Sequence, residues 1–214
     1  MRISLIVIST ALLGTIFLGL CGSALAQGSV PEIGKSLIHP AHPLYFLKAV
    51  REALELRFAN TTQAKAARYL EFAQRRVREV KSLAEVGRPD LIAPTLEHYF
   101  ANLQKVLGLA DLKTESKVEG VADIVDSHAQ NLAKIYSNID HQAARRSIRT
   151  TIFRVWEWNN LFKEKLDPKL QAMLEDKLSG TKAKVCHFLA KEASSSALNE
   201  VEREVLLARV QKCS

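Results

Sequence analysis

The histidines of this 214-residue chain are candidate metal ligands, because neutral imidazole commonly binds metal ions in proteins. His39 and His42 lie three residues apart in the segment His-Pro-Ala-His-Pro. Each precedes a proline, which favours extended backbone, and no cysteine, aspartate or third histidine lies near them in the sequence. We therefore favour a rigid approach to the first helix over a metal site.

His128 is a third weak metal candidate, because it falls on the apolar seam of an expected helix. A buried imidazole there could be a metal ligand or a pH switch, but a hydrogen-bonded core histidine is the more common case. A histidine-based metal carrier stays open as an alternative function. It would require His98, His128 and His141, or the His39 and His42 pair, to converge.

Arginine side chains form the densest basic face of the chain, close to Trp156 and Trp158. Such a face could bind phosphates or stack on bases, although we see no firm indication of nucleic acid. An interface between two helix pairs has the same composition, and Glu157 and Glu164 lie nearby, so we favour packing within the molecule. Polyanion binding remains the alternative. The arginines concerned are Arg145, Arg146, Arg149 and Arg154.

Two cysteines, Cys186 and Cys213, remain if the chain is cut after residue 26, and an even number suits an oxidising compartment. A turn centred on Ser195 would leave Cys213 about 13 Å beyond the level of Cys186, so a bond requires the chain to curl back or the loop to shift the pairing. We predict the disulfide, because two unpaired thiols are unusual in a secreted chain.

Motifs of known catalytic chemistry are absent from the sequence. It has no glycine-rich phosphate loop, no Gly-x-Ser-x-Gly, no His-Glu-x-x-His and no paired-cysteine metal motif. We therefore predict no catalytic residues, no cofactor and no enzymatic activity. An enzyme whose site assembles from distant residues stays open as a rival.

The composition is typical of a folded helical protein. Hydrophobic residues make up 47% and charged residues 25% of the chain, while aromatic residues are sparse at 7%. Alanine, leucine, glutamate, lysine and arginine are plentiful, and all of them favour helices. The net charge of +7 is a moderate excess that could favour an anionic surface.

The first 26 residues have the layout of a secretory signal peptide. Arg2 precedes the apolar run Ile3–Leu20, and Ala24-Leu25-Ala26 provides small residues before a cut at Gln27. The apolar run is also long enough for an uncleaved membrane anchor, and a lipid-modified Cys21 is a third possibility. We expect cleavage and a secreted or periplasmic chain, which would contact the membrane only if the signal stays uncleaved.

A helical hairpin is the element around which the rest must be arranged. Apolar residues recur every three or four positions in Thr61–Gly87 and again in Pro89–Leu107, so each arm has one apolar stripe. Gly87 can end the first arm and Pro89 can begin the second. We expect Asn60 or Thr61 to cap the first arm. Its arginines, including Arg75 and Arg76, we place on solvated outer faces.

Further helices are expected on both sides of the hairpin. In the first, Leu44–Phe58, Tyr45 and Phe46 should fix its start against the hairpin. Asp140 should cap the helix that begins at His141. Ser179-Gly180 should bend or split the helix that begins at Asp167. In the last helix Val201, Val205 and Ala208 should point inward. After the hairpin the expected helices are Glu115–Ser137, His141–Leu166, one that begins at Asp167, and Asn199–Lys212.

Several segments resemble a bacterial family of extracytoplasmic proteins, the domain of unknown function DUF5667. They are Pro-Leu-Tyr-Phe-Leu-Lys at 43–48, Ala-Arg-Tyr-Leu-Glu-Phe-Ala-Gln-Arg-Arg at 67–76, Gly-Arg-Pro-Asp-Leu-Ile at 87–92 and Leu-Glu-His-Tyr at 96–99. The resemblance covers about Ser36–Ile139. It implies an extracytoplasmic helical domain and supplies no functional residues.

These observations together predict an all-α, antiparallel up-and-down bundle of six to seven helices built from hairpins. We expect a signal peptide at 1–26, an extended leader at 27–43, a helical domain at 44–139 and C-terminal helices at 140–214 that extend the bundle or pack on it. The expected function is an exported interaction or scaffold module of the cell envelope. Its partner would be an unidentified envelope protein or a polyanionic surface.

Overall fold

The computed structural model describes residues 33–110, 112–195 and 198–212. These residues form seven α-helices and one short 3₁₀ helix, with no strand among them, so the predicted all-α bundle is confirmed. The helices are α1 (Tyr45–Phe58), α2 (Thr62–Glu85), η1 (Pro89–Leu91), α3 (Ile92–Leu109), α4 (Glu115–Ser137), α5 (Gln142–Glu164), α6 (Pro168–Ala193) and α7 (Glu200–Gln211).

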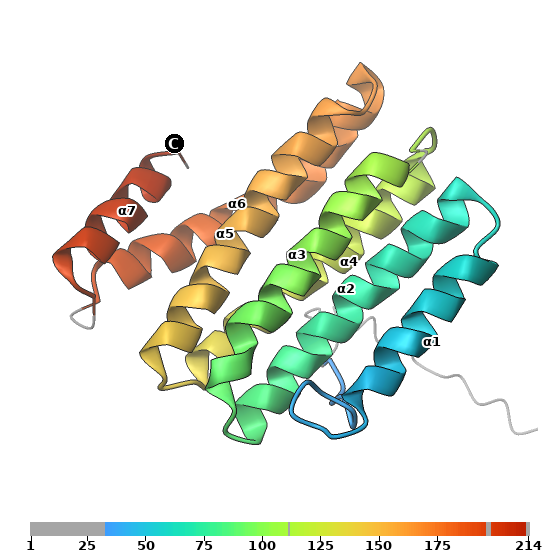
Figure 1. Ribbon diagram of the computed structural model, residues 1–214. Coiled ribbons are helices and arrows are strands. Elements are labelled where there is room, and N and C mark those ends of the chain that lie inside the picture. Colours follow the sequence, from blue (N-terminus) through green and yellow to red (C-terminus); the bar gives the residue numbers. More distant parts are fainter. Residues whose placement is uncertain (1–32, 111, 196–197, 213–214) are drawn as a thin grey trace, which may run out of the picture.

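The helices stand in two layers. α1, α2, α3 and α5 lie side by side, and α4 and α6 lie behind them (Figure 1). α1 lies at one edge of the molecule and α7 at the other (Figure 1). Among the described helices only α2 packs beside α1, and only α6 packs closely along α7.

The α2–α3 hairpin forms as the sequence predicts. Thr61 caps α2, because its side-chain oxygen accepts a hydrogen bond from the Ala64 amide at 3.0 Å. Gly87 ends the arm with a φ of 70°, a left-handed conformation that favours glycine. The predicted seam residues of α3 are all buried: Ile92, Leu96, Tyr99, Leu103 and Val106.

One hydrophobic core runs through the described bundle from Ile33 to Leu206. Trp158 of α5 lies fully inside it, stacks on Phe162 and donates its indole N–H to the Leu103 carbonyl of α3 at 3.0 Å. The helices after residue 140 therefore share a core with the helices before it.

Details at several helix ends differ from the expectations. His141, not Asp140, caps α5, because its Nδ1 accepts from the Ala144 amide. α6 runs without a break through Ser179 and Gly180. In α7 Leu206 is the buried residue. The three residues expected to point inward from α7 are exposed: Val201, Val205 and Ala208.

Candidate functional site

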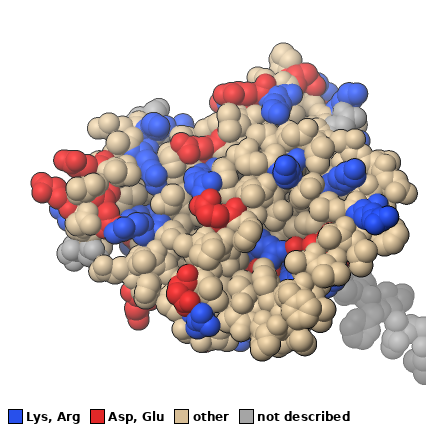
Figure 2. Space-filling view, viewed as in Figure 1, with Lys and Arg blue, Asp and Glu red and all other residues tan. Residues whose placement is uncertain are grey.

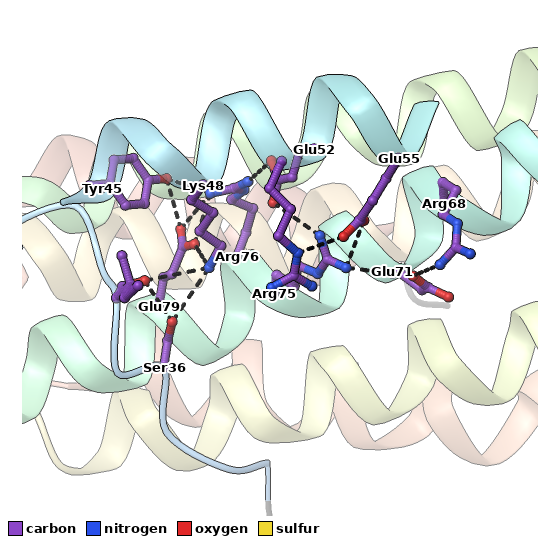
Figure 3. A network of polar contacts seen from close by, with 12 residues as sticks. Ser36, Tyr45, Lys48, Glu52, Glu55, Arg68, Glu71, Arg75, Arg76 and Glu79 are labelled. Carbon is purple, nitrogen blue, oxygen red and sulfur yellow. Dashed lines mark hydrogen bonds and ion pairs between the residues drawn. The ribbon is translucent and has the colours of Figure 1, made fainter. Parts of the chain in front are cut away.

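Helix α1 meets α2 through its polar side. Tyr45, Lys48, Glu52 and Glu55 all turn toward α2, where they face arginines and a glutamate (Figure 3). No residue of α1 is classed as buried, which is unusual for a helix at the edge of a bundle. We call the contact between these side chains and α2 the polar interface.

Glu79 is the centre of the polar interface and is completely buried. It accepts hydrogen bonds from the Arg76 guanidinium at 2.7 and 2.8 Å and from the Tyr45 hydroxyl at 3.1 Å, and it also pairs with Lys48. Arg76, only 5% exposed, reaches Glu52 as well. Each buried charge therefore has at least one partner of opposite sign.

The electrostatics of the polar interface follow from this burial. Burial and the nearby Glu79 carboxylate raise the pKa of Tyr45 far above its ordinary value, so its hydroxyl keeps its proton. Burial alone would lower the pKa of Arg76, but the charges of Glu79 and Glu52 outweigh it and raise the pKa. The tyrosine thus donates and the guanidinium stays charged.

A second group of ion pairs extends the polar interface toward the end of α1. Arg75 lies 2.8 Å from Glu55 and 3.6 Å from Glu52 (Figure 3). Its guanidinium stands over the Phe72 ring at 4.9 Å. Arg51 binds Glu55 from the same helix at 2.6 Å. Both acidic residues of α1 are therefore bound on its inner side.

The leader segment closes the other end of the polar interface. The Lys48 ammonium donates to the Ser36 hydroxyl at 3.4 Å and to the Ile38 carbonyl at 3.5 Å. The Ser36 amide in turn donates to the Ser82 hydroxyl of α2 at 2.8 Å. Residues 33–44 are thus tied to both helices.

The apolar side of α1 points away from the molecule as a consequence. Five large apolar side chains are between 47% and 75% exposed. We call them the outer face of α1: Phe46, Leu47, Val50, Leu54 and Phe58. Phe46 was expected to fix the start of the helix against the hairpin, and that expectation is wrong; Tyr45 does make this contact.

The ion pairs explain why the apolar side stays outside. Turning α1 over would bury its apolar groups, but it would also remove Tyr45 and Lys48 from Glu79. A buried charge without a partner is strongly unfavourable. The orientation of α1 is therefore determined by the charges of α2.

The sequence carried a signal for this arrangement that periodicity of apolar residues does not detect. Tyr45, Lys48, Glu52 and Glu55 recur at spacings of three, four and three, the same spacing as an apolar seam. Arg75 and Arg76, expected on solvated faces, are instead covered by these side chains. The helical spacing of these polar residues indicates the side of α1 that packs on α2.

The predicted arginine face lies on α5, and each of its members pairs with a glutamate of another helix. Arg154 binds Glu97 of α3 at 2.6 Å. Arg146 pairs with Glu202 of α7, and Arg149, 6% exposed, lies 3.7 Å from the same carboxylate. Arg145 lies over the Tyr136 ring and 4.0 Å from Glu192. These contacts join α5 to its neighbours.

An open groove of about 510 Å³ lies between α5 and α7. Arg146, Arg149 and Arg209 line it together with the apolar Val201, Val205 and Leu206. Arg209 stands over the Phe153 ring at 4.5 Å, and burial lowers its pKa. The groove therefore combines basic and apolar groups, with two of its arginines already paired to Glu202.

The candidate metal ligands do not form a metal site among the described residues. His39 and His42 contact each other edge to face, with 6.5 Å between ring centroids. His42 accepts a hydrogen bond from the Leu44 amide. His98 is exposed on α3. In the part of the chain that the structure describes, no group of three or more histidine, cysteine or acidic residues could hold a metal ion.

His128 lies in the core of the bundle with no exposed surface. Its ring packs edge to face on Tyr99, 5.6 Å between centroids, and neither ring nitrogen has a hydrogen-bond partner among the described residues. Burial, helped by the charge of Arg78, lowers the pKa of His128 to about 3. The imidazole is therefore neutral at physiological pH.

The cysteine prediction is only partly covered by the described residues. Cys186 is half-buried and lies in the second half of α6, before α7 begins. Cys213 lies outside the described residues, so the Cys186–Cys213 bond stays a prediction. The expected signal peptide at 1–26 lies outside them too.

A family model described as "Domain of unknown function (DUF5667)" matches residues 37–147, more than half of the chain. The chain belongs to the DUF5667 family. The resemblance inferred from residues 36–139 is thereby confirmed. The DUF5667 region contains α1 to α4 and the start of α5, so both the polar interface and the outer face of α1 lie inside it.

No curated protein and no solved structure matches the chain. The DUF5667 description names no activity, ligand or partner. Among the described residues, no helix is both long enough and apolar enough to cross a membrane.

Proposed function

We propose that this DUF5667 protein is an exported, non-enzymatic helical interaction module of the bacterial cell envelope, which acts by surface contact. The observation that supports the proposal is the outer face of α1. Large apolar side chains gathered on one exposed helix face are typical of a binding surface. Here the ion pairs beneath it hold the face outward.

The export part of the proposal is supported by the sequence. The layout of the first 26 residues is that of a signal peptide, and the mature chain would begin at Gln27 with a net charge of +6, since Arg2 is the only charged residue removed. A disulfide between Cys186 and Cys213 would fit an oxidising compartment. It would join α6 to the end of the chain beyond α7.

Binding of a polyanion by α5 is a weaker candidate. Each of its four arginines already has a glutamate partner within the molecule, so a polyanion would have to displace those carboxylates. The apolar side chains of the outer face of α1 need no such exchange. We therefore place the contact surface on α1.

Photo-crosslinking in intact cells that export the chain tests the proposal. The photoreactive residue p-benzoylphenylalanine would replace Phe46 or Phe58 on α1, and Val201 on α7 as the control, since Val201 is an equally exposed apolar residue at the opposite edge. We expect adducts, with protein or with lipid, from both α1 positions and none from Val201. Absence of any adduct from α1, or equal adducts from all three positions, would overturn the proposal.

A further inference from the structure

The outer face of α1 is a continuous apolar stripe. Phe46, Val50, Leu54 and Phe58 follow one another at four-residue steps, so they form a slanting row over about 120° of the helix surface, with a phenylalanine at each end. At the lower right of Figure 2, where α1 lies, most of the visible surface is uncharged, with basic side chains at the right-hand edge. This is the pattern of a helix that lies flat on an apolar boundary.

The charges around the stripe are of one sign. Glu52 and Glu55 are the only acids of α1, and both are bound on its inner side. Arg57 is exposed beside the stripe, Arg51 is exposed there while it is bound to Glu55 at 2.6 Å, and Lys65 is exposed in the first turn of α2. The border of the outer face therefore complements an anionic surface.

The size of the face argues against a protein partner as its main occupant. A helix of 14 residues is about 21 Å long, so its outer face covers only a few hundred Å². Stable protein–protein interfaces bury about 1,200–2,000 Å² in total, and among the described helices only α2 packs beside α1. A bilayer requires no matching partner surface.

The place of α1 in the chain agrees with this choice. It is the first helix after the apolar run Ile3–Leu20, which predicts passage through, or retention in, a membrane. If that run stayed in the bilayer, the 13 residues from Leu20 to Ile33 could span at most about 45 Å. The folded bundle would then be held close to lipid headgroups.

We propose that the outer face of α1 binds the surface of an anionic phospholipid bilayer, with its phenylalanine and aliphatic side chains among the acyl chains and Arg51 and Arg57 at the headgroups. This inference rests on the proposed function and names the partner of the same surface. The polar interface serves it by keeping α1 helical and its apolar side outward in water.

The test is sedimentation with large unilamellar vesicles, using the chain that starts at Gln27. This chain lacks the apolar run but keeps every residue of the core. Vesicles containing phosphatidylglycerol are compared with vesicles of phosphatidylcholine alone. The test variant is Phe46→Ser with Phe58→Ser, and the matched control on α7 is Val201→Ser with Leu207→Ser, which removes two exposed apolar side chains elsewhere. Circular dichroism checks that each variant stays helical.

We expect the unsubstituted chain and the α7 variant to sediment with phosphatidylglycerol vesicles, and the α1 variant to partition at least tenfold less. Arg51→Ala with Arg57→Ala should weaken binding and reduce its dependence on salt. The inference is overturned if the unsubstituted chain stays in solution, or if both serine variants bind alike.

Two other results would overturn the inference for different reasons. A dimer that the α1 variant disrupts, without vesicle binding, would make the occupant a second copy, and cellular adducts with a protein would make it a protein partner. Both would leave the proposed contact function of α1 standing. If no cellular adduct, with protein or with lipid, depends on the outer face, the proposed function fails as well.

Discussion

At the scale of single residues, Glu79 has the most demanding environment among the described charges. Its side chain has no exposed surface and holds two cations and a tyrosine hydroxyl around one carboxylate. Ion pairs of this kind gain little over well-packed apolar residues, but breaking one leaves a desolvated charge behind. Glu79 therefore matters chiefly because it keeps Lys48 and Arg76 from being buried without a counter-charge.

Glu79→Ala should accordingly lower the free energy of unfolding by about 3–5 kcal/mol, because Lys48 and Arg76 lose their buried counter-charge. Denaturant unfolding measures the change. The matched control is Glu71→Ala on the same helix, whose carboxylate is 47% exposed and pairs with an exposed Arg68. That change should amount to about 0–1 kcal/mol. Equal losses in the two variants would show that the polar interface is not buried.

His128 presents the opposite situation, a titratable group kept neutral by the core. Its pKa is lowered from 6.5 to about 3, so the unfolded chain takes up a proton at a pH where the folded chain does not. Stability from this site is therefore complete above pH 6.5 and is lost as the pH falls toward 3.

His128→Leu should remove this pH dependence while filling the same space. Between pH 7 and pH 5 the unsubstituted chain should lose about 2 kcal/mol more of its unfolding free energy than the variant does. Urea unfolding of both chains at several pH values measures the difference. Parallel pH profiles would mean that His128 is accessible to water or paired.

At the scale of elements, the sequence predicted the positions of the helices better than it predicted which side of each helix faces the core. The seams of α2, α3, α4 and α5 are apolar at helical spacing, and burial of apolar surface alone places them inward. The hairpin joint follows from Gly87 and Pro89, whose backbone preferences are local. These features depend only on residues close together in the chain.

The orientation of α1 could not be predicted in the same way. Its apolar stripe is evident in the sequence, but the side that packs is chosen by Arg75, Arg76 and Glu79, which belong to another helix. The spacing of apolar residues within one helix gives no information about charged residues on the neighbouring helix. In α7 the expected inward residues Val201 and Val205 are exposed and line the groove beside α5, while Leu206 packs into the core.

Two glycines give a paired test of helix boundaries. Gly87 ends α2 at φ 70°, where a side chain is strained even though the space is open, so Gly87→Ala should destabilise the protein by about 1 kcal/mol. Gly120 lies exposed inside α4 with nothing within 4 Å of an added Cβ, so Gly120→Ala should stabilise it by about 1 kcal/mol. Thermal or denaturant unfolding measures both, and the same sign for both would contradict the assigned helix end.

At the scale of the whole molecule, the described chain combines one continuous core with two edges that carry exposed apolar residues. α2 to α6 bury one another around Trp158, while α1 and α7 each lie against a single neighbour along their length (Figure 1). The DUF5667 match includes α1 but ends before α6 and α7. The edge at α1 is therefore the one that belongs to the family region.

The unfolding free energy of the variant Phe46→Ser with Phe58→Ser tests the outward orientation of α1 most directly. If the outer face is exposed, the two serines should change stability by less than about 0.5 kcal/mol each, as surface substitutions do. Phe162→Ser, at a fully buried position, provides the reference and should cost at least about 3 kcal/mol. A loss in the α1 variant as large as that of Phe162→Ser would contradict the orientation, and with it the proposed contact surface.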